Sequence, residues 1–276
     1  MVGWWYMAGH LSNKRKYGHI RLIVMVVMSV ILLVHSREGN TRTLRFVTLE
    51  YPPYQYLEEN NAKGIGVNMV NEVFNRMDKP FVIEFLPWGR ALREVQAARA
   101  DGIFTIYFSE ERQKTMLFSQ QVLINQSVSI FSNRDSDLNL TGDINELRQL
   151  RVGLVRNVSY GKEIDSAIAQ GVINKVVETT SGTQSFKLLL ADRVDVVISN
   201  QLGGFDILRR LNIQQLVQLH SEYEFVIPSY FAFPKTWRGE KLKQQFDATL
   251  QKMKSDGTYK AVLAQSLLCS GNDCKD

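Results

Sequence analysis

Residues 104–120 read FTIYFSEERQKTMLFSQ. The stretch begins with an apolar strand pattern, passes Ser109, and then carries two acidic residues before Arg112. Serine is a preferred helix N-cap, and acidic residues in the first turn suit the positive end of the helix dipole. The pattern therefore predicts a strand that ends near residue 108 and a short helix over 109–116. Arg112 would then lie where the strand passes into the helix.

Arg112 is the main candidate for ligand binding in this stretch. Its guanidinium group offers a rigid pair of donors that matches a carboxylate, in a hydrogen bond worth about 1.5–3 kcal/mol net. The start of a helix adds free backbone N–H donors, whose partial positive charge also favours an anion. The alternative is an exposed Arg112 that pairs with Glu110 or Glu111, which would contribute little. The stretch by itself leaves both interpretations open.

Strand-like and helix-like segments alternate along the rest of the chain. Apolar runs predict strands over 44–49, 81–87, 102–108, 128–133, 151–156, 194–199 and 225–234. Three- and four-residue apolar steps predict helices over 66–77, 88–100, 160–170, 183–193 and 240–268, the last broken at 255–257.

This alternation predicts an α/β fold in which helices flank mainly parallel sheets. A polar link near 133–145 separates two series of strands and helices, so we expect two lobes. The expected divisions are lobe one over 43–126 and 230–268, lobe two over 134–222, hinge strands at 127–133 and 223–229, and a tail over 269–276.

The first 36 residues have the layout of a secretory signal peptide. They hold four basic residues and no acidic one, followed at 22–34 by LIVMVVMSVILLV, which is apolar apart from one serine. A signal peptide has about 7–15 apolar residues, whereas a membrane-spanning helix needs about 20. We expect cleavage after Ser36 and export to the periplasm. An uncleaved N-terminal anchor and a start at Met7 remain open.

Charge and cysteine content limit the function classes. Loss of the four basic leader residues lowers the formal net charge from +5 to +1, which gives no support for nucleic-acid binding. In an exported protein Cys269 and Cys274 are expected to form a disulfide, with two free thiols as the alternative. His220 is the only histidine after the leader, so we expect neither a metal site nor a cofactor.

No catalytic motif stands out. A serine or cysteine nucleophile needs a histidine base, and no G-x-S-x-G elbow accompanies His220. The chain also lacks a P-loop and a G-x-G-x-x-G turn after a strand. We therefore expect a protein that is not an enzyme.

Aromatic residues follow the predicted strands at the end where parallel sheets bind ligands. The loop after the first strand contains two prolines and three tyrosines, Tyr51, Tyr54 and Tyr56, and Trp88 follows the second strand. We expect Tyr51 and Tyr54 to be the more exposed tyrosines and to line a ligand, with at least one tyrosine structural. Trp88 could equally fill the core or stack on a ligand.

The order of these segments resembles that of family 3 extracellular solute-binding proteins, the periplasmic components of polar amino-acid ABC importers. The resemblance covers nearly all of 43–268, and 109–123 (SEERQKTMLFSQQVL) carries its most specific signature. The other matching stretches are 51–73, 91–104, 150–161, 188–200, 230–237 and 252–267. The resemblance implies a two-lobed fold that closes on a ligand.

The resemblance also implies roles for single residues. The signature arginine, which takes the ligand carboxylate, corresponds to Arg112, and the aromatic residue after the first strand corresponds to Tyr51 or Tyr54. Second-lobe donors correspond to Val158 and Ser159, and Thr105 and Tyr107 correspond more loosely. Asn200 stands where the family has an acid that binds the ligand ammonium group. Either Glu163, Asp206 or another acid replaces it, or the ligand is not a standard amino acid.

The expected function is capture of a small carboxylate-bearing solute by a monomer that delivers it to an inner-membrane ABC permease. Three alternatives stay open: a ligand-sensing input to a membrane receptor, a periplasmic dehydratase-like enzyme on the same fold, and an interaction protein with an empty cleft.

Overall fold

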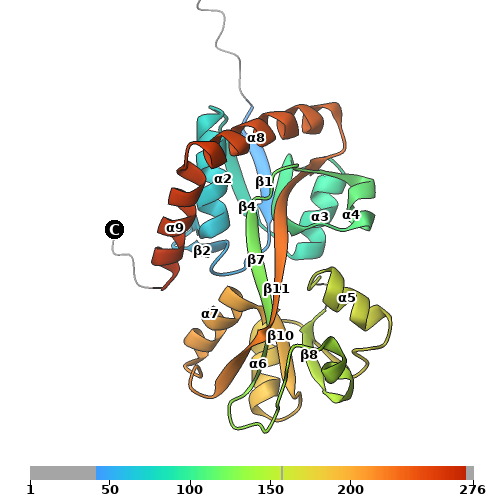
Figure 1. Cartoon of the computed structure of the whole chain (residues 1–276). Helices are drawn as coiled ribbons and strands as arrows, with labels where there is room; N and C mark the ends of the chain where they lie inside the picture. Colours follow the sequence, from blue (N-terminus) through green and yellow to red (C-terminus); the bar gives the residue numbers. More distant parts are fainter. Residues whose placement is uncertain (1–41, 157, 272–276) are drawn as a thin grey trace, which may run out of the picture. The chain divides into compact units, whose positions relative to one another are not determined.

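The computed structural model describes residues 42–156 and 158–271 (Figure 1). Lobe one begins with three parallel strands in the order β4 (Phe81–Phe85), β1 (Leu44–Thr48) and β5 (Gly102–Tyr107). Helices α2 (Ile65–Arg76) and α3 (Trp88–Gln96) connect them, and a short hairpin, β2 (Tyr56–Glu58) and β3 (Asn61–Lys63), precedes α2. The carboxyl ends of these parallel strands therefore share one edge.

Two long strands pass from lobe one into lobe two. They are β7 (Ile124–Asn133) and β11 (Val217–Pro234), which run antiparallel to each other (Figure 1). In lobe one β11 pairs with β5 and with β6 (Met116–Phe118), and in lobe two β7 pairs with β10 (Val196–Asn200). One sheet therefore continues through both lobes, in the order β4-β1-β5-β11-β7-β10-β8-β9 with β6 beside β11.

Lobe two has the same arrangement as lobe one, with its own parallel strands and flanking helices. Strands β10, β8 (Val152–Val155) and β9 (Val176–Thr179) are parallel, and helices α5 (Lys162–Ala169), α6 (Gly182–Leu190) and α7 (Gln201–Leu211) pack around them. A 3-10 helix, η1 (Ile144–Gln149), enters the lobe. The chain then returns through β11 to lobe one, where α8 (Trp237–Ser255) and α9 (Thr258–Gly271) end the described part.

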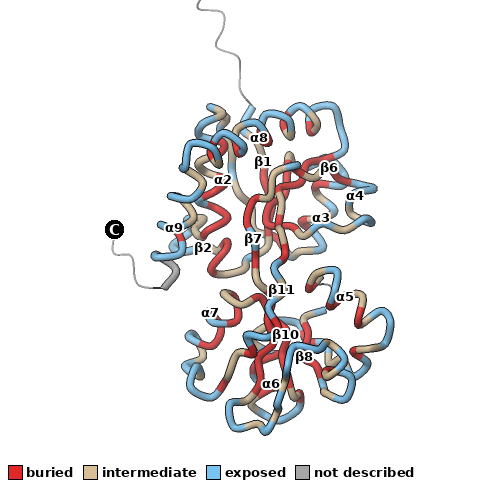
Figure 2. The backbone as a smooth tube through the Cα atoms, in the orientation of Figure 1, coloured by how far each residue is buried: buried red, intermediate tan, exposed pale blue. Residues whose placement is uncertain are grey.

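Apolar cores lie on the faces of the sheet in each lobe, where Figure 2 shows the buried residues concentrated. In lobe one the largest core stacks phenylalanine rings with centroids 4.5–5.9 Å apart around Phe46, Phe74 and Phe246. The α8 stripe that the sequence predicts, Leu242, Phe246, Leu250 and Met253, is 0–8% exposed. Helix α8 is therefore held by its apolar face.

The fold class predicted from the sequence is confirmed: an α/β fold in two lobes with mainly parallel strands and two connecting strands. The sequence patterns missed β9, α7, β6 and the β2-β3 hairpin. The sequence predicts two sheets joined by two hinge strands, and in the structure β7 and β11 make them one continuous sheet. The predicted hinges, 127–133 and 223–229, lie inside these two strands.

Two predictions concern residues that the structure does not describe. The leader and its cleavage site fall before residue 42, and the Cys269–Cys274 disulfide involves Cys274 beyond residue 271. Among the described residues, no helix is both long enough and apolar enough to cross a membrane.

Candidate functional site

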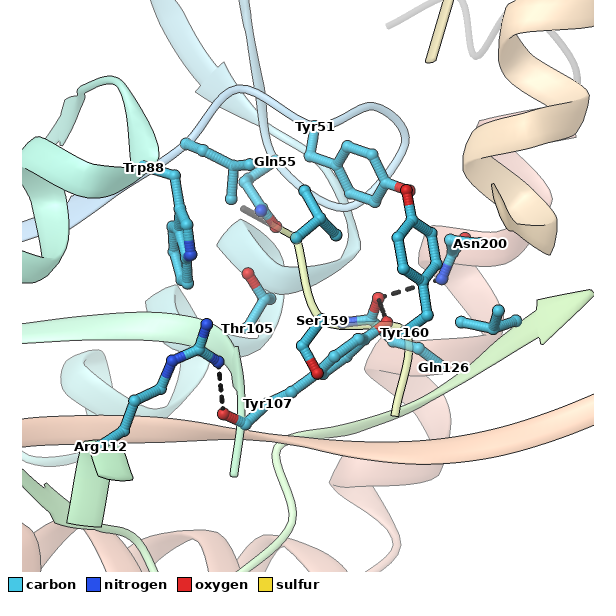
Figure 3. Close-up of a pocket in the computed structure, with 13 residues that line it drawn as sticks. Tyr51, Gln55, Trp88, Thr105, Tyr107, Arg112, Gln126, Ser159, Tyr160 and Asn200 are labelled. Carbon is cyan, nitrogen blue, oxygen red and sulfur yellow. Dashed lines mark hydrogen bonds between the residues drawn. The ribbon is translucent and has the colours of Figure 1, made fainter. Parts of the chain in front are cut away.

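A cavity lies at the carboxyl ends of β1 and β5, where lobe one faces the start of α7 and the loop after β8 (Figure 3). Its accessible volume is about 90 Å³, and the space up to and including its open mouth is about 600 Å³. Its walls come from both lobes and from β7 between them. The topology therefore brings together loops that are far apart in the sequence.

Arg112 enters this cavity from the first turn of α4 (Glu110–Thr115). Ser109 caps the helix as predicted, because its Oγ accepts a hydrogen bond from Arg112 N at 3.2 Å. The guanidinium Nη1 donates to the Tyr107 carbonyl at 2.9 Å, and the group stands 5.7 Å from the centroid of the Trp88 ring (Figure 3). A carbonyl and an aromatic face thus hold Arg112 in place while other N–H donors stay available.

The charge of Arg112 has no close counter-charge. Within 42–156 and 158–271, no carboxylate comes within 4.0 Å of its nitrogens, so the structure contains no ion pair to Glu110 or Glu111. Burial lowers the pKa of Arg112 from its ordinary value, and the more distant charges of Asp165 and Glu111 oppose that shift. A half-buried cation of this kind is suited to an anionic ligand.

Thr105 lies in the middle of β5 with a φ angle of +57°. Positive φ is rare for a β-branched residue, because its side chain crowds the backbone there. The register against β11 shifts at this point, since Ile106 faces Tyr230 and Phe104 faces Phe231. Thr105 is therefore the extra residue of a β-bulge, a feature that is common beside binding sites.

Asn200 closes the lobe-two side of the cavity from the N-terminus of α7. Its Oδ1 accepts from Gly203 N at 3.0 Å, and its Nδ2 donates to Tyr54 Oη at 3.2 Å and Gln126 Oε1 at 3.1 Å. Gln126 Oε1 also accepts from the Tyr107 hydroxyl at 3.0 Å. This neutral network links lobe one to lobe two through the hydrogen bond between Tyr54 and Asn200.

The loop that carries Tyr51 and Tyr54 is fixed against α2. The two rings stack with centroids 6.1 Å apart, and Tyr54 is only 2% exposed. Burial raises the pKa of Tyr54 to about 12, so its hydroxyl stays neutral and able to hydrogen-bond. Gly64 makes the close approach possible, because a Cβ atom there would lie 2.5 Å from the Tyr54 carbonyl oxygen.

The loop after β8 is tied together by an acid. Ser159 Oγ donates to Asp165 Oδ2 at 2.5 Å, and Tyr160 N donates to Asp165 Oδ1 at 2.9 Å. The Tyr160 hydroxyl accepts from Val155 N at 2.7 Å, and burial raises its pKa to about 12. Ser159 and Tyr160 thereby present fixed polar and aromatic groups to the cavity.

Comparison with known proteins bears on what this cavity serves. The family model of bacterial extracellular solute-binding proteins, family 3, matches residues 44–267. The chain belongs to this family. A curated relative, the probable amino-acid-binding protein YxeM of Bacillus subtilis (strain 168), is 22% identical over 213 residues, which cover 76% of this chain and 78% of that protein.

Solved structures confirm the solute-binding fold. A histidine kinase sensor domain with similarity to periplasmic binding proteins matches with a TM-score of 0.73 and 21% identity, covering 83% of this chain and 98% of the other. An ancestral arginine-binding protein bound to arginine matches with a TM-score of 0.69 and 20% identity, covering 82% and 99%. At these identities the likeness concerns the fold alone.

The structure of this solute-binding protein brings most of the predicted residues together. Eight of them line the cavity: Tyr51, Trp88, Thr105, Tyr107, Arg112, Val158, Ser159 and Asn200. Tyr54 does not line it, and the expectation that Tyr54 is among the more exposed tyrosines is wrong, because its ring packs into the core of lobe one. Its hydroxyl still reaches the site through Asn200.

The sequence interpretation missed several lining residues. They are Leu49, Gln55, Gln126, Val128 and Tyr160. Gln126 was missed because the strand was expected to begin at 128, whereas β7 begins at Ile124. Gln55 and Tyr160 are neighbours of predicted residues, so the loops that contain them were the available signal.

Neither acid suggested as a replacement at position 200 lines the cavity. Asp206 is paired with Arg209 at 2.9 Å and with Arg210 at 2.8 Å. Glu163 is exposed and borders a different hollow beside β11. Among the described residues, the cavity walls therefore contain no carboxylate.

Proposed function

We propose that this protein captures a small carboxylate-bearing solute, an amino acid or a close relative, and presents it to an ABC importer of the inner membrane. Arg112 carries the proposal: it is a half-buried cation on the cavity wall with no carboxylate within 4.0 Å among the described residues. A ligand carboxylate would supply the missing counter-charge through two N–H donors.

Binding is proposed to close the two lobes around the solute. Support comes from walls that both lobes supply and from β7 and β11, whose hinge segments would absorb the movement. Family membership supports an extracellular solute-binding role, and we propose the periplasm as its location. We also propose that the protein binds its solute without catalysing a reaction on it. In support, the described lining residues include no histidine, lysine, aspartate or glutamate to act as a general acid or base.

The test begins with mass spectrometry of small molecules released from the purified, denatured protein. Each acid found is then returned to ligand-free protein in a thermal-shift assay. We expect Arg112→Gln to lose most of the shift, at least tenfold in affinity, because a charge-assisted pair is worth about 1.5–3 kcal/mol. Exposed Arg148 on η1 provides the matched control Arg148→Gln, which should keep the shift. An unchanged shift in Arg112→Gln would refute the role of Arg112.

A sensing role is the second candidate, because the histidine kinase sensor domain matches with a TM-score of 0.73. In that case the solute-loaded protein would signal to a membrane receptor. Pull-down of membrane proteins by the loaded protein separates the two: a permease supports import, and a receptor supports sensing.

A further inference from the structure

The charge inventory of the cavity is unbalanced. Arg112 is the only lining side chain, among those described, that carries a charge at neutral pH. The other polar side-chain groups on the wall are neutral: amides, hydroxyls, phenols and an indole N–H, at Gln55, Gln126, Asn200, Thr105, Ser159 and Trp88 and on the tyrosines. One carboxylate on the ligand would neutralise the site. A ligand that also carried an ammonium group would leave one positive charge without a partner.

Two of the three side-chain amide oxygens on the cavity wall are committed to protein donors. Gln126 Oε1 accepts from Tyr107 and Asn200, and Asn200 Oδ1 accepts from Gly203 N. Gln55 Oε1 is buried and has no hydrogen-bond partner among the described residues. This amide oxygen suits a neutral donor such as a hydroxyl group or an amide N–H. It cannot replace the counter-charge that a buried ammonium group requires.

The acids around the cavity are already engaged. Asp165 accepts from both Ser159 Oγ and Tyr160 N, and it does not line the cavity. Asp206 is paired with two arginines. Its Oδ2 forms one of these ion pairs, at 2.8 Å from Arg210 Nε. Neither acid is placed to meet a ligand inside the cavity as the structure stands.

We propose that the physiological ligand is a small organic acid without an ammonium group, with its carboxylate on Arg112, at most neutral donors elsewhere, and its body against the aromatic wall. The inference rests on the proposed function, since it assumes that Arg112 holds a carboxylate. Tyr51, Trp88, Tyr107 and Tyr160 supply that wall, which suits an apolar or flat body. The site would then select against standard amino acids rather than for them.

The test uses matched trios of probes that differ only at the α-carbon. One trio is L-phenylalanine, 3-phenyllactate and 3-phenylpropionate, and the others are L-alanine, lactate and propionate, and L-leucine with its hydroxy and deamino counterparts. Calorimetry on wild-type protein is expected to show binding of the hydroxy or deamino acid at least about tenfold tighter than the amino acid in at least one trio. Tighter binding of the amino acids, or no binding of any hydroxy or deamino acid, would overturn the inference.

Asn200→Asp provides the decisive variant. An aspartate keeps the cap on Gly203 N, and the Tyr54 hydroxyl and the Gln126 amide can reorient to donate to it. The new charge should raise affinity for the amino acid of a bound trio by about tenfold or more and weaken binding of its deamino partner. Exposed Asn139 provides the control Asn139→Asp, which adds the same charge away from the cavity and should leave the preference unchanged.

These outcomes separate the two proposals. If amino acids bind wild-type protein most tightly and Arg112→Gln abolishes that binding, the proposed function stands and the inference about ligand class is wrong. If no probe or co-purified acid depends on Arg112, the proposed function itself is wrong. An Asn200→Asp variant that gains no affinity for amino acids would also contradict the inference.

Discussion

Thr105 shows how one residue can hold strain beside the cavity. Its φ of +57° in a buried part of β5 places a β-branched side chain in the left-handed region. Such a conformation costs of order 1–3 kcal/mol and persists only where the surroundings impose it. Here the bulge opposite β11 imposes it, and the same bulge turns the residue toward the cavity.

Replacement of Thr105 by glycine should therefore be unusually mild. Thr48 in β1 is the matched control, because it is also buried and its hydroxyl also faces the Phe104 carbonyl. Glycine relieves strain only at position 105, because Thr48 has no positive φ. Thr48→Gly should therefore lose about 1–3 kcal/mol more free energy of unfolding than Thr105→Gly. Urea denaturation measures both, and equal losses would show that Thr105 holds no strain.

For single residues, the sequence predicts which side chains line the cavity better than it predicts how exposed each side chain is. Arg112 and Ser109 could be placed because a cap, a dipole and a guanidinium group have local signatures. Tyr54 was misplaced because its burial depends on contact with α2 across Gly64, which no local pattern reports. The Thr105 bulge likewise arises from pairing with β11, more than a hundred residues further along the chain.

At the scale of elements, an ion-pair network ties β1, β4 and α3 together. Arg45 on β1 binds Glu84 on β4 at 2.6 Å and Glu94 on α3 at 3.0 Å, and Arg99 adds a bond to Glu94 at 2.9 Å. Hydrogen bonds from Arg99 and Arg45 lower the pKa of Glu94 to about 2. The network therefore depends on the ionised form of Glu94.

Stability should reflect this pKa as the solution is acidified. A carboxyl group whose pKa is lower in the folded state stabilises the fold above its ordinary value, near 4.5, and this contribution disappears as the pH falls toward about 2. At pH 7 the wild-type protein should have a higher midpoint of unfolding than Glu94→Gln. The difference between the two midpoints should shrink steadily between pH 4.5 and 2. Exposed Glu178→Gln corrects for net charge, and a difference that is constant with pH would contradict the assignment.

Element types were largely predictable because apolar periodicity over ten or more residues reports a buried face. The α8 stripe is an example. Helix α7 was missed because glycines interrupt its pattern at Gly203 and Gly204, where Tyr51 and Phe131 pack closely against the backbone. Strand β9 was missed because only four residues form it, on the edge of the sheet.

At the scale of the whole molecule, contacts between the lobes should be coupled to binding. The Tyr54 hydroxyl on lobe one meets Asn200 on lobe two. In Tyr54→Phe the lost hydrogen bond, worth about 0.5–1.5 kcal/mol, should weaken ligand affinity roughly 2–10-fold while the fold is kept.

A matched variant within one lobe distinguishes coupling between lobe contact and ligand binding from a general loss of stability. Tyr259 donates to the Leu123 carbonyl at 3.1 Å; Leu123 lies in the core of lobe one, and Tyr259 packs against that core. Tyr259→Phe should reduce the free energy of unfolding by a similar amount and leave affinity unchanged. If calorimetry shows that Tyr54→Phe and Tyr259→Phe lose ligand affinity equally, or that neither loses it, closure through Tyr54 and Asn200 is contradicted.

Ligand binding by Arg112 is tested most directly by a crystal structure of the protein with the organic acid that co-purifies with it. We expect a carboxylate in the cavity, with its oxygens about 2.7–2.9 Å from the Arg112 guanidinium nitrogens. A bound molecule that touches other walls while Arg112 points to solvent would show that Arg112 does not bind the ligand.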